Sequence, residues 1–373
     1  MAGLSKVERV LLAAVAAASA LAGAANYGAW PAVPRFALAT VALAGLAWVV
    51  ALGTEQLGEH VGAAATGALQ ATLGNLPELL VVVFALKAGE VVVAQTALVG
   101  SLLANALLVL GLAIVAGARQ APDGVMRFSS RLPNDATTLL MVTIFLIVLI
   151  GLALSSGSAA AGHVDTISVV GACCLLGVYG AWLVPYLRRG DAVGETDAGQ
   201  APGRSSPATD PAPTALEPSA PRISMRAAVV LLLAAALGAG FVSEWFVNAL
   251  RPAIEVLHIS TAFAGLVIVA IAGNAVEHLS SITLAARGKA DLAIAVVKSS
   301  VAQTAAFLYP ALVLISLALP TQLTFALSPV YIGALGLMTL AVWQVTGDGE
   351  AAAFEGWALA AIYAIVAVVA AYQ

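Results

Sequence analysis

Charged side chains are scarce in this chain. Only 10% of its 373 residues are Asp, Glu, Lys or Arg, whereas 61% are hydrophobic. A soluble domain usually carries about 25% charged residues. This composition excludes a soluble enzyme and predicts an all-α polytopic membrane protein. The net charge of −4 decides little, because the charged residues are concentrated between the apolar segments.

Cysteine is nearly absent too, and the two cysteines stand side by side. Cys173 and Cys174 lie within an apolar segment, a spacing that suits neither a zinc site nor an ordinary disulfide. We therefore interpret both as packing residues. The predicted helices also lack Ser/His, Asp/Asp and HExxH constellations. Their absence argues against an intramembrane hydrolase, so no enzymatic activity and no cofactor are expected.

The chain is rich in long apolar runs. Runs of about 20 apolar residues predict transmembrane helices. The first run follows Lys6 and Arg9 and is also compatible with a signal peptide, although its core continues towards Trp30. The segment 188–224 is rich in Pro, Gly, Ser and Ala, so we expect a flexible linker there. The eleven predicted helices cover approximately 7–27, 33–54, 61–87, 91–117, 134–155, 165–187, 225–250, 259–287, 290–319, 325–346 and 352–372.

The distribution of Lys and Arg predicts the orientation of these helices. With the N-terminus in the cytoplasm, twelve of the sixteen basic residues lie in cytoplasmic segments. Arg35, Lys87 and Arg251 then lie on the far side, and Lys298 lies within a helix. We therefore expect a cytoplasmic N-terminus, a cytoplasmic linker and a C-terminus outside.

Two stretches carry the same motif at a constant offset of 199 residues. "GNLPELLVVVFALKAGEVVVAQTALVGSLLAN" begins at Gly74, and "GNAVEHLSSITLAARGKADLAIAVVKSSVAQT" begins at Gly273. Each copy predicts a helix with an Asn-x-x-Glu, a short glycine-containing turn and a second helix that carries serine. In the predicted topology the copies enter the membrane from opposite sides. Inverted repeats with interrupted helices are typical of secondary transporters whose site lies near the middle of the bilayer.

The acidic residue of each copy is the candidate functional group. A carboxylate at the centre of a bilayer costs at least ~2.5–3.5 kcal/mol and usually marks an ion or proton path. Asn75 and Glu78 are three residues apart and share a helix face, as do Asn274 and Glu277. Pro77 and the two Gly-Asn pairs should also loosen the helical hydrogen bonding and free carbonyl groups to face the site.

If the two copies face one another, these carboxylates and amides converge with the hydroxyls of Ser101 and Ser300. Such oxygen ligands suit a hard cation such as Ca²⁺, which takes roughly six to eight of them. Without a cation, two buried carboxylates cannot both stay charged cheaply, so protons are the natural alternative occupants. The residues alone thus predict a cation/proton exchanger.

These motifs resemble those of the Ca²⁺/H⁺ antiporters in the calcium/cation exchanger superfamily. "GNLPELLVVVFALKAGEVVVAQTALVGSLLANALLVLG" is similar to the first repeat motif of that family. "GNAVEHLSSITLAARGKADLAIAV" with the later "SSVAQ" is similar to the second motif, and "VTGDGEAAAFEGWALAAIYAI" to the last loop and helix. The resemblance covers roughly 54–117 and 240–372.

The resemblance implies a ten-helix core of two inverted five-helix repeats, preceded by one extra helix. The expected parts are the extra helix in 1–30, the first repeat in 31–187, the linker in 188–224 and the second repeat in 225–373. The implied substrates are Ca²⁺ and protons, and the expected surroundings are a lipid bilayer, with no nucleic-acid partner. The expected location is the inner membrane of a bacterium.

The resemblance also implies a site. Glu78 and Glu277 are expected to bind the cation and to carry the protons. A structural ion pair or a protonated packing carboxylate is the alternative for each, and the matched positions favour ligands. Two asparagines, two serines and one glutamine are the other implied ligands: Asn75, Asn274, Ser101, Ser300 and Gln303. The alternatives for the asparagines are helix capping or bonds to neighbouring helices, and the alternative for the serines is close helix packing.

Three features depart from the pattern of the family. Pro77 stands where a small residue is usual, and Ser299 stands where glycine is expected, which puts close helix approach there in doubt. The linker has scattered rather than clustered carboxylates, so regulation by calcium binding to it is not expected.

Four further polar residues have weaker assignments. His278 is a candidate proton relay, with a bond to a neighbouring helix as the alternative. Glu244 is a possible vestibule residue or an interfacial residue beside Trp245. Glu55 and Glu59 are either an ion-attracting mouth or part of a solvated loop.

Lys298 is the only basic residue that lies deep within a predicted helix. At 100° per residue it projects about 200° away from Ser300 and about 140° away from Gln303. We therefore expect it to be peripheral and to reach the cytoplasmic interface or a neighbouring helix.

The sequence thus predicts exchange of Ca²⁺ for H⁺ by alternating access around Glu78 and Glu277. One alternative keeps the mechanism and changes the ion to Na⁺, K⁺ or Mn²⁺. Another is a channel-like or sensor protein that binds a cation without coupled transport.

Overall fold

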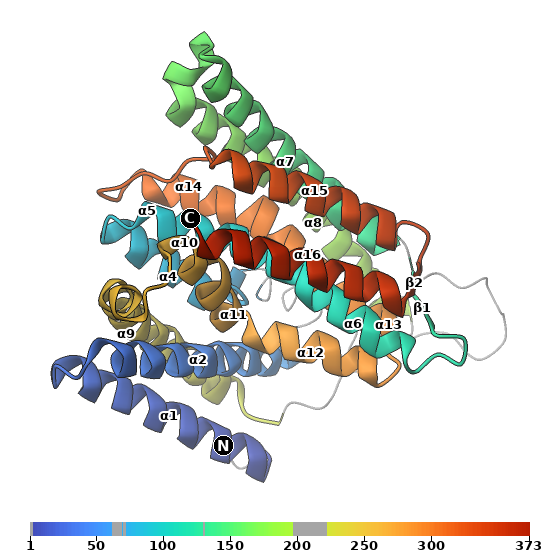
Figure 1. Cartoon of the computed structure of the whole chain (residues 1–373). Coiled ribbons are helices and arrows are strands. Elements are labelled where there is room, and N and C mark those ends of the chain that lie inside the picture. Colours follow the sequence, from blue (N-terminus) through green and yellow to red (C-terminus); the bar gives the residue numbers. More distant parts are fainter. Residues whose placement is uncertain (1–2, 62–68, 70–71, 130, 197–221) are drawn as a thin grey trace.

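The computed structural model describes residues 3–61, 69, 72–129, 131–196 and 222–373. Its elements are almost all helices (Figure 1). Among the described residues, nine helices are long and apolar enough to cross a membrane, and a bent helix pair brings the number to as many as ten. The predicted all-α polytopic membrane fold is confirmed. The count of eleven stays a prediction, because the predicted span 61–87 lies partly outside the described residues.

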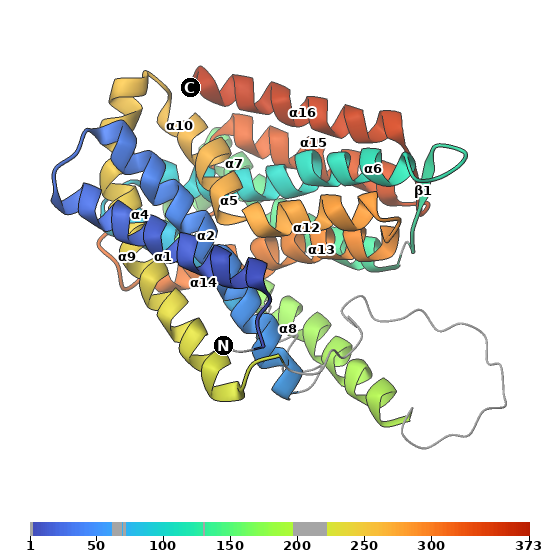
Figure 2. The same ribbon diagram turned by 90° about the horizontal axis from the view of Figure 1, so that it is seen from below.

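The N-terminal helices pack side by side with the helix that follows the linker (Figure 2). A capping box starts α1 (Lys6–Tyr27), since the Glu8 amide donates to Ser5 Oγ (3.2 Å) and the Ser5 amide donates to Glu8 Oε2 (2.7 Å). Next to α1 lies α2 (Ala32–Val61), which packs along α9 (Met225–Leu257) more extensively than any other two described helices pack together.

The prediction that this second helix ends at residue 54 is wrong, because α2 continues to Val61. Glu55 and Glu59 therefore lie on a helix rather than in a loop. The Arg222 guanidinium lies between α1 and α2 and holds the extra turns in place. Its Nη1 donates to Glu8 Oε1 (2.7 Å), and its Nη2 donates to Glu55 Oε1 (3.2 Å).

Both copies of the repeated motif form the same series of elements, a helix, a glycine turn and a second helix with a π-helical turn inside it. The turns have left-handed glycines, Gly89 at φ +80° and Gly288 at φ +73°. The elements of the first copy are α4 (Leu76–Lys87), α5 (Val91–Leu103), η1 (Ala104–Val109) and α6 (Leu110–Ala118). Those of the second are α12 (Ala275–Ala286), α13 (Ala290–Gln303), η4 (Thr304–Leu308) and α14 (Tyr309–Ser316). The helix that leads into the second copy, and is counted with it below, consists of α10 (Thr261–Phe263), η3 (Ala264–Val269) and α11 (Ala270–Gly273).

Small residues let the two copies approach closely. On α5, a Cβ at Gly100 would overlap the Leu266 backbone of η3 and would lie 2.5 Å from Leu266 Cα. On η3, a Cβ at Gly265 would overlap the side chain of Thr96. Such backbone-to-backbone contact is typical of membrane helices that associate through small side chains. It places Ser101, the neighbour of Gly100, directly against the second copy.

The remaining helices cover this pair of motifs. They are α7 (Arg131–Ser156), α8 (Val164–Thr196) with the short η2 (Ala159–His163) before it, α15 (Pro329–Thr346) and α16 (Ala353–Ala371). The linker prediction is wrong at its start, because α8 continues to Thr196, past residue 188. Residues 197–221 of the predicted linker lie outside the described residues.

The interpretation of the cysteines as packing residues is also wrong. Cys173 and Cys174 are both exposed on α8. A thiol is apolar enough to face lipid chains, so this position has no polar cost.

A short antiparallel ribbon ties two loops together at one end of the bundle (Figures 1 and 2). It pairs β1 (Val125–Arg127) with β2 (Glu350–Ala352), with Met126 opposite Ala351. Arg127 forms ion pairs with Asp123 (2.7 Å) and Glu350 (3.2 Å). The hydrogen bond from this guanidinium lowers the pKa of the exposed Asp123 carboxyl. The α6–α7 and α15–α16 loops are therefore held on the same side.

Candidate functional site

The candidate site is built where the helices of the two motifs are interrupted. α4 starts directly after the Gly74–Asn75 turn, and Pro77 lies in its first turn, where no intrahelical N–H is needed. α11 ends at Gly273 and α12 begins after Asn274, with a bend of 64° between the two parts. The predicted interruption is thus confirmed in the second copy and seen as a turn in the first.

Each interruption places a carboxylate at the start of a helix. Glu78 lies in the first turn of α4, and Glu277 lies in the first turn of α12. The partial positive charge of a helix N-terminus favours a negative group there. Asn75 and Asn274 stand at the N-cap positions, yet neither side chain caps its own helix. The capping alternative is therefore wrong, and both amides are available to other partners.

These amides bond to helices of the other copy of the motif, as the alternative of bonds to neighbouring helices predicts. Asn274 Nδ2 donates to Ser101 Oγ (3.0 Å) and to the Ala270 carbonyl (3.1 Å). Asn75 Nδ2 donates to Gln303 Oε1 (3.3 Å). Two reciprocal cross-links thus connect the start of α12 with α5 and the start of α4 with α13. The amide oxygen of Asn75 has no hydrogen-bond partner.

A third chain of bonds ends on Glu277. Its Oε2 accepts a hydrogen bond from Ser300 Oγ (2.5 Å), and Ser300 Oγ accepts one from Asn105 Nδ2 (3.2 Å). Asn105 is 1% exposed and belongs to the π-helical turn η1. Such turns are rare and frequently lie at functional sites, since the wider backbone re-aims a side chain.

Sequence reasoning missed Asn105. The signal was present as a lone amide in the apolar run "GSLLANALLVLG", four residues after Ser101 and therefore on the same helix face. The matching position in the second copy is Thr304, whose hydroxyl is buried without a hydrogen-bond partner. The two motifs are thus not identical in their ligands.

Glu78 is the least satisfied group of the site. Its side chain is 2% exposed, and neither of its carboxylate oxygens accepts a hydrogen bond. Ser101 and Asn274 lie beside it, and the Glu277 carboxylate is close enough to repel it. A buried polar group without a partner is costly, so these acceptor oxygens are chemically suited to a cation or a proton.

Six of the seven predicted ligands form three hydrogen-bonded pairs, Asn75 with Gln303, Asn274 with Ser101 and Glu277 with Ser300, and Glu78 lies beside the second pair. Glu277 and Gln303 are half-buried, and the others are buried. Within the described part of the chain, no group of three or more His, Cys, Asp and Glu side chains could hold a metal. The cluster instead offers two carboxylates with amide and hydroxyl oxygens, a donor set that suits a transported hard cation.

Ser299 occupies the position at which glycine is expected in the second motif. Its side chain is half-buried, and its hydroxyl accepts a hydrogen bond from Gln303 Nε2 (3.2 Å). Together with the bond from Asn75 to Gln303 Oε1, this contact fixes the orientation of the Gln303 amide.

The other predicted polar residues lie outside the cluster of ligands. His278 is 7% exposed, and its Nε2 has no hydrogen-bond partner. Glu244 is half-buried on α9 beside Trp245, whose ring packs edge-on against Tyr27. Glu55 pairs with Arg222, and Glu59 follows one turn later on α2. Their proposed vestibule roles stay predictions.

The expectation of a peripheral Lys298 is wrong in one respect. The side chain does point away from the ligands, but it is only 2% exposed and does not reach an interface. The predicted alternative of a bond to a neighbouring helix is confirmed, since Nζ donates to Thr346 Oγ1 on α15 (3.1 Å) and to Thr137 Oγ1 on α7 (3.3 Å). Hydroxyl acceptors inside the bundle make it unnecessary for the ammonium to extend to water.

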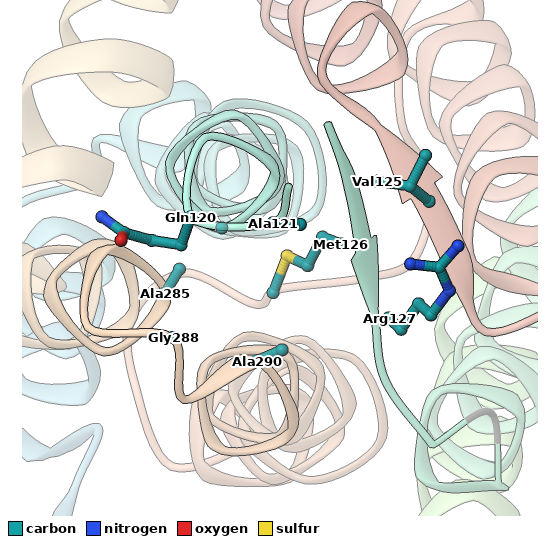
Figure 3. A pocket seen from close by; sticks show the side chains of 9 residues that line it. Gln120, Ala121, Val125, Met126, Arg127, Ala285, Gly288 and Ala290 are labelled. Carbon is teal, nitrogen blue, oxygen red and sulfur yellow. The ribbon is translucent and has the colours of Figure 1, made fainter. Parts of the chain in front are cut away.

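A separate pocket lies near the ribbon and is not the candidate site. Its volume is about 220 Å³, and it lies between the end of α6, β1 and the α12–α13 turn (Figure 3). Met126 and Ala285 give it an apolar lining, and its one charged side chain, Arg127, already pairs with Asp123 and Glu350. None of the predicted ligands lines it.

Comparison with known proteins shows the family of the chain. The family model described as "Sodium/calcium exchanger protein" matches residues 32–186 and 227–372. The chain belongs to the sodium/calcium exchanger protein family. The predicted resemblance to Ca²⁺/H⁺ antiporters is thereby confirmed, and the chain is a multi-pass membrane protein of an antiporter family rather than of an enzyme family.

Relatives of similar length are named for one activity. The Ca²⁺/H⁺ antiporter of Synechocystis is 32% identical over 93% of both chains. The Ca²⁺/H⁺ antiporter ChaA of Bacillus subtilis is 30% identical over 97% of this chain and 99% of its own. The solved structure of YfkE has a TM-score of 0.76 at 27% identity and covers 97% of this chain and 100% of its own. The H⁺/Ca²⁺ exchanger CAX shares the fold, with a TM-score of 0.71 at 17% identity over 98% of this chain and 93% of its own.

Proposed function

We propose that this protein exchanges Ca²⁺ for H⁺ across a membrane, with Glu78 and Glu277 as the shared site for the cation and the protons. The observation that carries the proposal is the Glu78 carboxylate, which is buried, has no hydrogen-bond partner and faces groups from both motifs. Two relatives that match along nearly their whole length are named Ca²⁺/H⁺ antiporters.

The chemistry of exchange follows from the charge of the site. A bound Ca²⁺ neutralises both carboxylates and replaces their mutual repulsion with attraction. The remaining ligands are the neutral oxygens of Asn75, Asn274, Ser101, Ser300 and Gln303. When Ca²⁺ leaves, protons neutralise the same carboxylates, because two negative charges in a low dielectric are costly. Occupancy by one substrate therefore excludes the other.

Alternating access is supported by the arrangement of the two motifs, with residues 31–187 and 225–373 as the proposed inverted repeats. The α4–α5 turn lines a pocket with Arg251 and Thr261, near the α9–α10 end of the bundle. The α12–α13 turn lies beside the ribbon at the opposite end (Figures 1 and 2). Hairpins that point in opposite directions around one central site are what inverted repeats require.

We further propose that the N-terminus lies in the cytoplasm of a bacterium and that the protein resides in the inner membrane. Each contact between distant loops joins segments that the positive-charge count assigns to one side. Arg222 pairs with Glu8 and Glu55 on the proposed cytoplasmic side, and Arg251 pairs with Glu90 on the other. The ribbon likewise joins two proposed cytoplasmic loops.

Reconstituted vesicles test the function directly. With an imposed pH gradient, uptake of ⁴⁵Ca²⁺ should follow the gradient and should collapse when a protonophore is added. Uptake that ignores the gradient would indicate a cation-binding or channel-like protein without coupling. Gradient-driven uptake of Na⁺, K⁺ or Mn²⁺ in place of Ca²⁺ would keep the mechanism and change the substrate.

Acidification of the side from which Ca²⁺ is loaded should raise the apparent KM for Ca²⁺ more than it lowers the maximal rate. The physical reason is competition, since a protonated Glu78 or Glu277 is not available to a cation. Initial rates measured over a range of Ca²⁺ concentrations at several pH values check this. A fall in maximal rate at constant KM would instead place the proton site elsewhere, with His278 and Glu244 as the next candidates.

A further inference from the structure

Lys298 is a buried basic side chain that the proposed exchange chemistry does not use. Its side chain is 2% exposed and is one of the largest fully buried side chains in the molecule. Nζ donates to Thr346 Oγ1 on α15 (3.1 Å) and to Thr137 Oγ1 on α7 (3.3 Å). The ion pairs found among the described residues do not include it. A lysine that is buried inside a membrane bundle without a carboxylate partner is costly, which points to a function for this side chain.

Both acceptors are held in place by the helices that carry them. Thr346 Oγ1 donates its own proton to the Val342 carbonyl (2.7 Å), so its lone pairs remain for the ammonium. Thr137 is 4% exposed, and Thr346 is 1% exposed. The ammonium therefore bridges two buried hydroxyls on different helices, and three helices meet at one polar point.

The same segment of the chain is held by α7 at a second point. Thr143 is fully buried, and its Oγ1 shares its proton between the Leu139 carbonyl of its own helix (3.1 Å) and the Ala305 carbonyl in η4 (3.2 Å). Ser300 and Gln303 lie between Lys298 and Ala305 along the chain. The two ligands that α13 contributes are thus carried by a stretch that is tethered to α7 on either side.

The geometry of α13 separates the tether from the ligands. Lys298 projects about 200° from Ser300 and about 140° from Gln303, so the tether acts on the back of the helix while the ligands face the site. A rotation of about 20° around the helix axis would move a ligand oxygen by about 1 Å. That displacement is enough to break a bond to a cation that binds at ~2.3–2.6 Å.

We propose that Lys298 is a positioning residue for the cation site, which fixes the rotation of α13 by joining it to Thr137 of α7 and Thr346 of α15. The inference rests on the proposed function for the identity of the cation. It does not depend on exchange, because binding of Ca²⁺ alone reports on the geometry of the ligands.

Lys298→Met tests the proposal, since methionine keeps an unbranched apolar stem but removes all three donors. We expect the apparent KM for Ca²⁺ to rise about five- to tenfold, with the maximal rate per folded protein within about twofold of wild type. The Ca²⁺ concentration that produces a half-maximal rise in Tm of the purified protein should increase by the same factor. Lys289→Met is the matched control, since Lys289 is exposed at the N-cap of the same helix and should change neither value.

Thr346→Val removes one acceptor of the same contact. It therefore tests the proposal even if Lys298→Met fails to fold. It should weaken Ca²⁺ binding in the same direction, and the double variant should bind no more weakly than Lys298→Met alone. A lowered Tm with unchanged Ca²⁺ affinity would show a purely structural lysine and would overturn the proposal, as would additive losses in the double variant. If the wild type binds Ca²⁺ but does not exchange it for protons, the proposed function fails while the positioning role is still tested by binding.

Discussion

Glu78→Gln is expected to abolish pH-driven Ca²⁺ uptake while the protein stays folded in the membrane. Glutamine keeps the shape of the side chain but removes the negative charge and the exchangeable proton. A neutral amide at this position gives up the attraction between a divalent cation and a buried carboxylate, and a loss of about 3 kcal/mol corresponds to about 100-fold in affinity. Uptake into vesicles, normalised to monodisperse purified protein, measures the effect. Glu277→Gln should lose exchange to the same extent.

The matched control is Glu255→Gln. Glu255 is also a helical glutamate, but its side chain is 70% exposed and lies 3.8 Å from the guanidinium of Arg251. Exposed pairs of this kind contribute little, so this variant should transport as the wild type does. Near-normal exchange by either Glu78→Gln or Glu277→Gln would disprove a mechanism in which two carboxylates share the cation and the protons.

The membrane fold could be predicted because its signals are local. An apolar run long enough to cross a bilayer is complete within about 20 residues, and a Gly-Asn pair weakens the helix at its own position. The duplicated Asn-x-x-Glu motif added the long-range information that a single run lacks. It predicts that Asn75, Glu78, Asn274 and Glu277 share one site. In the structure both asparagines bond across to the other copy, and Asn274 and Glu277 lie near Glu78.

The errors concern features that depend on partners from distant parts of the chain. The end of α2 was placed too early because its last turns are polar, and nothing nearby in the sequence announces that Arg222 pairs with Glu55. The burial of Lys298 was missed because its two acceptors, Thr137 and Thr346, lie on other helices. Asn105 shares a helix face with Ser101, but it was overlooked because its partner Ser300 lies in the other copy of the motif and nothing near Asn105 in the sequence indicates that contact.

Asymmetry between the two motifs follows from the same contacts. In the first copy Gly100 allows α5 to lie against the backbone of η3. At the matching position of the second copy, Ser299 is half-buried and uses its hydroxyl to orient Gln303. Close approach is therefore needed at Gly100, and a polar contact takes its place at Ser299. Only the first of these positions should be intolerant of a methyl group.

Gly100→Ala is accordingly expected to have an effect second only to loss of a carboxylate. The added Cβ would lie 2.5 Å from Leu266 Cα and would overlap the Leu266 carbonyl, and backbone atoms cannot avoid it by a change of rotamer. Overpacking of this kind typically costs about 1–3 kcal/mol. Relief requires α5 to move away from η3, and Ser101 moves with it, so the bond from Asn274 Nδ2 is lost. We expect a lower Tm and a loss of Ca²⁺ uptake of about tenfold or more.

Gly336→Ala is the matched control for this prediction. Gly336 also lies within a helix, α15, but a Cβ there would meet no atom within 4 Å. Replacement of an unhindered helical glycine by alanine stabilises a protein by about 0.4–1 kcal/mol, chiefly because the unfolded chain loses freedom. The two variants should therefore shift Tm in opposite directions, and only Gly100→Ala should impair uptake. Equal Tm values and equal uptake in the two variants would contradict the close contact between α5 and the η3 backbone. The position of Ser101 next to Asn274 could then not be explained by that contact.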